Sequence, residues 1–213
     1  VKYQITDNHQ VYGQVARNFK VPGNFVWFGA IVGGVNRVDQ INDQLKAERS
    51  TNVDVGYRFF SKYVTFSSAL FAVDFKDRLS RQFLPDQAVT LDTNVGDATI
   101  RGFEAEVGTV PVAGFSAYAS VSYTKSRMKD NLVVSATNVQ PTSGKEFPDT
   151  PKWMTALALQ YASGPFYANV QGKYLGKRYS TLVNDEQVGG YTLFDLNVGY
   201  RFPSFGWLRN PTI

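Results

Sequence analysis

The 213-residue sequence predicts an all-β fold, an antiparallel transmembrane β-barrel segment with about eight complete strands of a larger barrel. Three observations predict it. Bulky or uncharged residues alternate with polar residues along many stretches. The links between these stretches are alternately short and long, and aromatic residues make up 15% of the chain. Alternation places the two faces of a strand in different surroundings, and aromatic girdles mark both edges of a membrane-embedded barrel.

The clearest alternation runs through Lys46–Phe59. One face carries Ala47, Arg49, Thr51, Val53, Val55, Tyr57 and Phe59. The other face carries Glu48, Ser50, Asn52, Asp54, Gly56 and Arg58. A tilted strand crosses a bilayer in about 9–11 residues, so this stretch is long enough to span it.

The same alternation predicts the other strands in chain order. The expected strands are Val1–Ile5, Gln10–Phe19, Lys46–Phe59, Tyr63–Leu79, Asp97–Gly108, Phe115–Met128, Pro151–Ala162, Pro165–Tyr179 and Gly190–Phe202, with another beginning at Pro211–Ile213. Short turns are expected at Thr6–His9, Phe60–Lys62, Thr109–Gly114 and Ser163–Gly164, and at Pro203–Asn210. Long loops are expected at Lys20–Leu45, Arg81–Gly96, Lys129–Thr150 and Thr181–Gly189. Short periplasmic turns and long extracellular loops are typical of outer-membrane barrels.

One strand has a less regular pattern. In Tyr63–Leu79, Ala69 and Phe71 have the opposite parity from Val64 and Phe66. A β-bulge near Ser67 and Ser68 would bring these residues onto one face.

The inward faces of the predicted strands are polar and ionisable. We expect Glu48, Asp54, Arg58, Glu104, Glu106, Asp195 and Arg201 to face the lumen. Side chains just fill the interior of an eight-stranded barrel, but so many polar groups suit a wider lumen at least as well. This favours a segment of a larger barrel.

Composition excludes several functions. No run of 18 apolar residues occurs, which excludes helical membrane spans, and the chain has no cysteine for disulfides, thiolate metal ligands or nucleophiles. The net charge of +4 is dispersed, so no nucleic-acid partner is expected. His9 lacks partner residues at metal-ligand spacing and is interpreted as a turn residue, so no metal site is expected.

Catalysis has no support in the sequence. Glu104 and Glu106 share a strand face, but salt bridges to Arg and Lys within the lumen explain them better than a glycosidase-like pair. No nucleophile triad or phosphate-binding loop is found. We therefore expect neither an enzyme nor a cofactor.

Several stretches resemble strands of the TonB-dependent outer-membrane receptors. They are KAERSTNVDVGYRFF at Lys46–Phe60, NVGDATIRGFEAE at Asn94–Glu106, YTLFDLNVGYRF at Tyr191–Phe202, and QVYGQVARNFKVPG at Gln10–Gly23. The resemblance implies the C-terminal part of a barrel of about 22 strands around a plug domain. It also implies location in the outer membrane of a Gram-negative bacterium and import of ferric-siderophore or related complexes, driven by TonB.

By this resemblance, residues 1–213 form a single region of the barrel, without the plug domain or the terminal hairpin. The implied partners are the iron complex, outer-membrane lipid, and the TonB complex acting through a plug outside this chain. Ligand contacts are expected from the long loops, where aromatic and cationic side chains suit anionic iron chelates. The candidates are Trp27, Phe28, Arg81, Phe83, Lys145, Phe147, Arg178 and Tyr179. Packing within the loops or girdles is the alternative role for these aromatics.

Two other protein classes stay open. A small self-contained outer-membrane barrel would act as a passive pore or a structural protein, and a soluble β-sandwich would act as a binding module. Both ends of the chain fall inside predicted strands, which favours a segment of a larger barrel over a complete small one. The sandwich would have to bury apolar faces such as that of Phe194, Leu196 and Val198 in one dry core.

Overall fold

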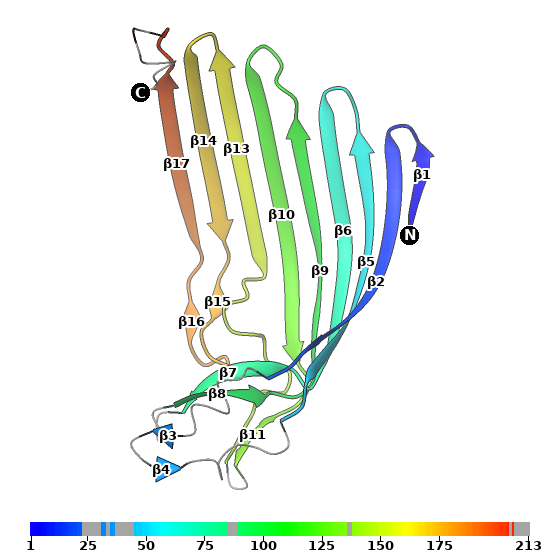
Figure 1. The fold of residues 1–213 in the computed structure, drawn as a ribbon, viewed down its shortest axis with the longest axis vertical. Helices are drawn as coiled ribbons and strands as arrows, with labels where there is room; N and C mark the ends of the chain where they lie inside the picture. The colour runs from blue at the N-terminus through cyan, green and yellow to red at the C-terminus, as the bar shows by residue number, and fades with distance from the viewer. Residues whose placement is uncertain are drawn as a thin grey trace.

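A nine-stranded antiparallel sheet dominates the structure, a computed structural model that describes residues 1–22, 31–32, 35–36, 45–84, 89–135, 138–204 and 206 (Figure 1). Its strands, in spatial order, are β1 (Lys2–Thr6), β2 (His9–Lys20), β5 (Glu48–Phe60), β6 (Val64–Lys76), β9 (Ala98–Thr109), β10 (Phe115–Met128), β13 (Trp153–Ser163), β14 (Phe166–Leu175) and β17 (Tyr191–Tyr200). Four two-stranded pairs lie in the links: β3 (Ile31–Val32) with β4 (Val35–Asn36), β7 (Leu79–Leu84) with β8 (Val89–Asn94), β11 (Leu132–Ser135) with β12 (Asn138–Gln140), and β15 (Arg178–Tyr179) with β16 (Gln187–Val188).

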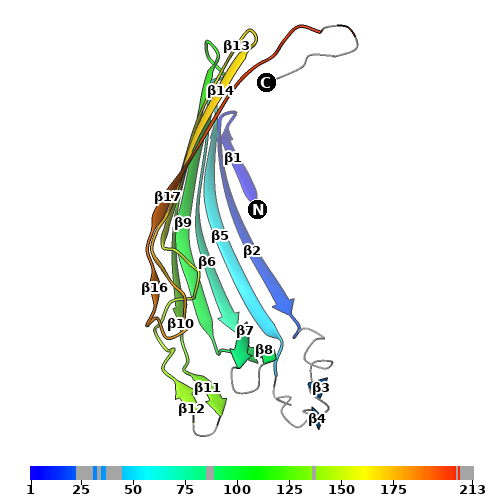
Figure 2. The same ribbon diagram turned by 90° about the vertical axis from the view of Figure 1, so that its left-hand side faces the viewer.

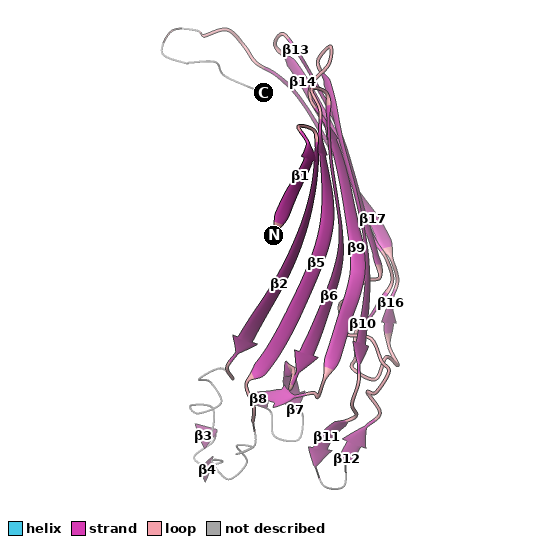
Figure 3. Cartoon of the chain, turned by 90° about the vertical axis from the view of Figure 1, so that its right-hand side faces the viewer, coloured by secondary structure: helices cyan, strands magenta, loops and turns pink. Residues whose placement is uncertain are grey.

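Spatial order in the sheet follows chain order. Each strand pairs with the strand of the same sheet that comes next in the sequence, so β2 pairs with β5 and β6 with β9. The short turns gather at one end of the sheet and the long connections at the other, as Figure 1 shows. The sheet is open, with β1 and β17 at its edges, and it is curved and twisted along its length (Figures 2 and 3). The eight complete predicted strands, the shorter strand predicted at Val1–Ile5 and the alternation of short and long links are confirmed.

The register gives the sheet two unlike faces. Val55 stands opposite Leu70, whose side chain is 67% exposed, and residues in phase with them form the apolar face. Asp54 and Glu104 belong to the opposite, polar face. The apolar face continues to β17, where Leu196 is 72% exposed. Such extensive exposure of large apolar side chains is expected where a sheet meets lipid.

The predicted β-bulge in β6 is wrong. Pairing between β5 and β6 runs without a shift from Arg49 opposite Lys76 to Phe60 opposite Thr65. The apolar residues Ala69 and Phe71 instead belong to the polar face, where each lies opposite a glycine of a neighbouring strand. Phe71 lies so close over Gly102 that a Cβ there would come within 2.6 Å of its ring. Because glycine has no side chain, the Phe71 ring can pack against the backbone at Gly102 even though this face of the sheet is otherwise polar.

Other boundaries also differ from the prediction. β6 ends at Lys76 instead of Leu79, and β14 ends at Leu175 instead of Tyr179. The β13–β14 turn is Gly164–Pro165, because Ser163 pairs with Phe166, and Gly164 adopts a φ of 56°, which suits glycine.

The long links are more ordered than expected. The stretch predicted as a loop at 81–96 contains most of the β7–β8 hairpin, and that at 129–150 contains β11 and β12. The predicted strand start at Pro211–Ile213 lies outside the described residues. Within the described part of the chain, no helix has the length and apolar character needed to cross a membrane.

Candidate functional site at the long-loop end

Three long connections surround a hollow of about 880 Å³ at the long-loop end of the sheet. Its lining residues are Arg78, Ser80, Val95, Met128, Gln140, Phe147, Pro148, Ser180, Thr181, Leu182, Val183 and Asp185. The lining mixes apolar side chains with charged, amide and hydroxyl groups in equal number. A concave site on which several polar groups converge is a candidate for binding a small polar ligand. This hollow is therefore the candidate binding site.

A small apolar core supports the hollow. It consists of Ala98 on β9, Met128 on β10 and Phe147 from the β10–β13 loop, and Phe147 is only 4% exposed. The Phe75 ring meets Phe147 edge-on, with 6.5 Å between ring centroids. The Phe147 N–H donates to the Ser126 hydroxyl at 2.9 Å. A buried ring and a buried hydrogen bond thus anchor this loop to the polar face of the sheet.

Arg78 stacks on this core and also lines the hollow. Its guanidinium carbon lies 3.6 Å from the ring centroid of Phe147 and 5.0 Å from that of Phe75. Burial lowers the pKa of Arg78, and the nearby Glu48 carboxylate partly opposes this shift. Glu48 also accepts a 2.8 Å hydrogen bond from the Leu79 N–H at the start of β7. A partly desolvated guanidinium in this position can attract an anionic ligand.

Two asparagine side chains fasten neighbouring links to each other. Asn94 accepts a hydrogen bond from the Lys46 N–H at 2.8 Å and donates to the Lys46 carbonyl at 3.0 Å. Asn184 does the same for Glu146, at 2.7 and 2.9 Å. Each amide satisfies both backbone groups of a residue in another link, as a paired strand would. We call these two residues the asparagine clamps.

The β10–β13 loop is also fastened internally. The hydroxyl of Thr142, which is fully buried, accepts from the Leu132 N–H and donates to the Asp130 carbonyl, both at 2.9 Å. Lys152 and Glu146 form an ion pair at 2.5 Å. The hydrogen bond to Glu146 raises the pKa of Lys152, although burial acts in the opposite direction.

Asp185 is an acidic group in the lining of the hollow. The Thr181 hydroxyl donates to its carboxylate at 2.5 Å, which lowers the pKa of Asp185. The charge of Lys145 lowers it further, so these two links bring opposite charges near each other. Lys145 is half-buried, and its backbone carbonyl accepts from the Met128 N–H at 2.9 Å.

The predicted ligand contacts occupy different surroundings. Trp27 and Phe28 lie outside the described residues. Arg81 and Phe83 belong to strand β7 of the β7–β8 pair. Phe147 packs into the loop-end core, and its ring serves as support for the hollow.

Arg178 and Tyr179 form β15, within the β14–β17 link. The Arg178 Nε donates to Asp149 at 3.2 Å, and its guanidinium carbon lies 5.8 Å from the ring centroid of Tyr191. Its Nη1 atom is buried without a hydrogen-bond partner in the described chain. The Tyr179 carbonyl accepts from the Asp149 N–H at 2.8 Å. The two residues therefore hold the β10–β13 loop against the next link.

Arg78, Gln140 and the asparagine clamps were missed at the sequence level. They are isolated polar residues in irregular links, so no periodic pattern distinguishes them from other loop residues. Asn184 adopts a φ of 59°, a conformation that asparagine tolerates well, and its Asn–Asp dipeptide is a turn signal. That signal predicts a turn but not a contact with Glu146.

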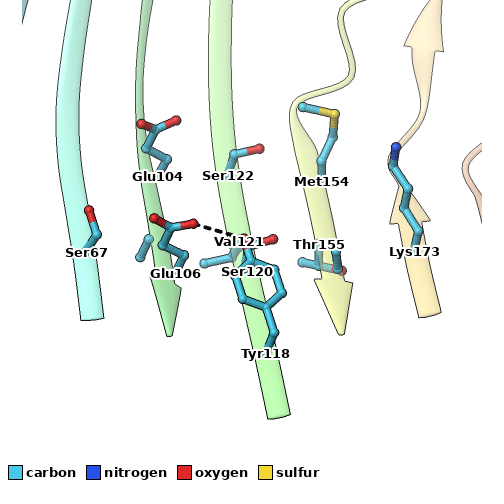
Figure 4. Close-up of a pocket in the computed structure, with 12 residues that line it drawn as sticks. Ser67, Glu104, Glu106, Tyr118, Ser120, Val121, Ser122, Met154, Thr155 and Lys173 are labelled. Carbon is cyan, nitrogen blue, oxygen red and sulfur yellow. Dashed lines mark hydrogen bonds between the residues drawn. The ribbon is translucent and has the colours of Figure 1, made fainter. Parts of the chain in front are cut away.

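The polar face carries the seven residues expected to line the lumen. Glu48, Asp54, Arg58, Glu104, Glu106, Asp195 and Arg201 share it by register or alternation. The Tyr118 hydroxyl donates to Glu106 at 2.9 Å inside a hollow of about 460 Å³, to which Glu104 and Lys173 also contribute (Figure 4). No salt bridge to either glutamate occurs among the described residues. Outside this hollow, the side-chain oxygens of Asn52 and Asn169 on the polar face are buried without a hydrogen-bond partner in the described chain.

His9 is the first residue of β2 instead of a turn residue. Its Nδ1 lies 2.6 Å from the Tyr57 hydroxyl, and its ring centroid is 5.0 Å from that of Phe59. His9 therefore belongs to an aromatic cluster at the short-turn end of the apolar face. The described part of the chain contains no group of three or more His, Cys, Asp and Glu able to hold a metal ion.

An apolar face, a polar face and long links gathered at one end define the wall of a transmembrane β-barrel. The chain belongs to the TonB dependent receptor-like β-barrel family, whose model matches residues 1–212. An uncharacterized TonB-dependent receptor from Haemophilus influenzae is 25% identical over 187 residues, which are 84% of this chain and 48% of that protein. The predicted family is therefore confirmed.

Solved structures of two receptors and one transporter share the fold. The ferric yersiniabactin uptake receptor FyuA from Yersinia pestis superposes with a TM-score of 0.73 at 22% identity, covering 93% of this chain and 28% of that one. The siderophore receptor PiuA from Acinetobacter baumannii gives 0.69 at 19% identity, with 93% and 28% covered. The copper transporter OprC gives 0.70 at 17%, with 94% and 30% covered. The chain spans about half the length of its curated relative and under a third of these structures.

Proposed function

We propose that this chain forms part of the barrel wall of an outer-membrane receptor that takes up a ferric-siderophore or similar iron complex with energy from TonB. The hollow at the long-loop end carries the proposal, because it joins the polar face of the wall to links that tertiary contacts hold in place. Family membership and the receptor folds of FyuA and PiuA support it.

The ligand contacts are proposed to come from the links around this hollow. Arg78 and Lys145 supply positive charge for an anionic chelate, and Gln140 supplies an amide. The predicted residues Trp27, Phe28, Arg81, Phe83, Arg178 and Tyr179 remain candidates, and Phe147 acts as the support beneath them.

The polar face is proposed to meet a plug domain through which the TonB complex acts. Glu104 has no salt bridge to the rest of the described chain, and Glu106 is bound only by Tyr118. A second protein surface with Arg and Lys side chains would supply ionic partners for these two glutamates.

Uptake of radiolabelled iron tests this proposal. The intact receptor is expressed in a Gram-negative strain that lacks its own siderophore receptors, with and without a functional TonB system. Iron supplied as ferric siderophores should accumulate only when both the receptor and TonB are present. Accumulation without TonB would favour a passive pore. Uptake of copper but not iron would contradict the proposed ligand class, which matters because OprC, a copper transporter, shares this fold.

The Lys145→Gln variant tests the ligand contact. It should weaken binding of an anionic ferric chelate by about 13- to 160-fold, since a charge-assisted hydrogen bond contributes about 1.5–3 kcal/mol. Lys62→Gln is the matched control, because Lys62 lies at the short-turn end, over the ring of Tyr63. Equal affinity of the two variants for the chelate would exclude Lys145 as a contact.

A further inference from the structure

Exposed cations gather on the apolar face at its long-loop end. Five of them define the cationic patch: Arg17 on β2, Arg49 on β5, Arg101 on β9, and Lys125 and Arg127 on β10. The apolar face of β13, β14 and β17 carries no Lys or Arg, and neither does the short-turn half of this face on β2–β10. The patch is therefore confined to one sector and one height of the wall.

The register forces two like-charge pairs within this sector. Arg101 stands directly opposite Lys125, and Arg49 stands directly opposite Lys76. Like charges directly opposite each other destabilise a sheet. Lys76 pairs with the Asp97 carboxylate, but Arg101 and Lys125 have no acidic partner among the residues that the structure describes. An external anion would relieve the repulsion between Arg101 and Lys125.

The carboxylates near the patch already have cationic partners. Asp74 lies on the same face and binds the Lys129 ammonium at 3.3 Å, and Asp97 forms an ion pair with Lys76. The described apolar face therefore offers no free carboxylate at this height to neutralise Arg101 and Lys125. The patch has a net positive charge.

The height of the patch matches the edge of a bilayer. Phe115, at the short-turn end of β10, and Lys125 are ten residues apart, which corresponds to about 33 Å of strand at about 3.3 Å per residue. At a strand tilt of about 40°, this distance gives a height of about 25 Å, which is the usual height of the apolar band. Arg101 and Lys125 therefore lie where the hydrocarbon ends and lipid head groups begin.

We propose that the cationic patch binds phosphate groups on the head groups of anionic lipids in the leaflet at the long-loop side. This inference rests on the membrane placement in the proposed function. A phosphate between Arg101 and Lys125 would accept hydrogen bonds from both, and the planar guanidinium suits two phosphate oxygens at once. Continuity with the apolar face favours a lipid phosphate, because acyl chains can cover Val53 and Leu70 while the head group meets the cations.

Lipid binding to the intact protein tests the inference. The protein is purified in neutral detergent and titrated with fluorescent phosphatidic acid and with phosphatidylcholine at physiological salt. The wild type should prefer phosphatidic acid, and the Arg101→Gln/Lys125→Gln double variant should bind it about thirtyfold more weakly. Lys2→Gln/Lys62→Gln removes the same charge outside the patch and should leave the affinity within about twofold of the wild type. Equal losses in the two double variants, or none, would overturn the inference.

Two further measurements separate the possible causes. Millimolar inorganic phosphate should displace little phosphatidic acid, and complete displacement would show a free-phosphate site instead. Arg101→Gln alone should slightly raise the melting temperature in neutral detergent, because it removes a like-charge pair, and should lose the rise that phosphatidic acid gives the wild type. A variant that still responds to the lipid would contradict the role of Arg101.

Failure of the proposed function has a different signature. Insertion is measured by flotation of the protein with phosphatidylcholine vesicles. Protein that does not insert contradicts the membrane placement, whereas protein that inserts but has no preference for phosphatidic acid contradicts only the lipid site.

Discussion

Val55→Arg tests the most basic claim about the wall, that the apolar face of the sheet meets lipid. Val55 is 57% exposed and stands opposite Leu70 and Gly13, so the new side chain would have no acidic neighbour across either strand. It lies four residues from Phe59 and six from Arg49, or about 13 and 20 Å along the strand. Val55 is thus near the middle of the apolar band. An arginine there should destabilise the folded protein by about 2–4 kcal/mol, or about 30- to 900-fold in the folding equilibrium.

The assay is a urea titration of the intact protein folded into phosphatidylcholine vesicles. Gln14→Arg is the matched control, because it introduces the same side chain on the polar face, opposite Asp54. Its free energy of unfolding should stay within about 0.5 kcal/mol of the wild type. If Val55→Arg were as mild as Gln14→Arg, the assignment of the apolar face to lipid would be wrong.

Three other perturbations test the long-loop end. Asn94→Ala and Asn184→Ala should speed amide exchange in the links they fasten, since each removes two hydrogen bonds to backbone groups, worth about 0.5–1.5 kcal/mol apiece; unchanged exchange would show that the clamps are dispensable. Phe147→Ala should cost about 3–5 kcal/mol within the loop-end core and impair ligand binding while the wall still assembles, as checked by heat-modified gel mobility; unaffected binding would contradict the supporting role of the core. The ion pair with Glu146 raises the pKa of Lys152, so the stability it contributes is present below the unfolded value of about 10.4 and is lost as pH rises through the higher folded value. Thermal unfolding of Lys152→Met should therefore lack part of the wild-type decline at strongly alkaline pH, and parallel curves for the two proteins would refute the coupling.

The wall could be predicted from the sequence because its two faces meet unlike surroundings. Alternation located β10 at both of its bounds, and β9 within one residue at each end. The prediction failed in β6, where Phe71 and Phe75 share the polar face. Phe71 is there because Gly102 leaves space for its ring, and Phe75 because Phe147 covers it. Local alternation does not reveal which neighbouring strand or returning loop will cover an apolar residue.

The long links could not be predicted for a related reason. The strands of the β7–β8 and β11–β12 hairpins are only three to six residues long, so any alternation in them is a weak signal. Contacts between residues far apart in the sequence fasten the links that contain them. Asn94 binds a residue 48 positions away, and Asn184 one that is 38 positions away. Nothing in the sequence around either asparagine identifies its partner. The candidate site depends on these contacts, so its residues were the part least accessible to prediction.

The same contacts bear on how the proposed receptor would bind its ligand. Ordering one loop residue costs about 1–2 kcal/mol of conformational entropy, and a loop that orders only on binding subtracts that cost from affinity. Here the clamps, the buried hydroxyl of Thr142 and the core around Phe147 order the links before any ligand arrives. Deleting one clamp should therefore weaken ligand binding even though neither asparagine lines the hollow. A clamp variant with faster amide exchange but unchanged affinity would show instead that the ligand contacts only residues held by the wall itself.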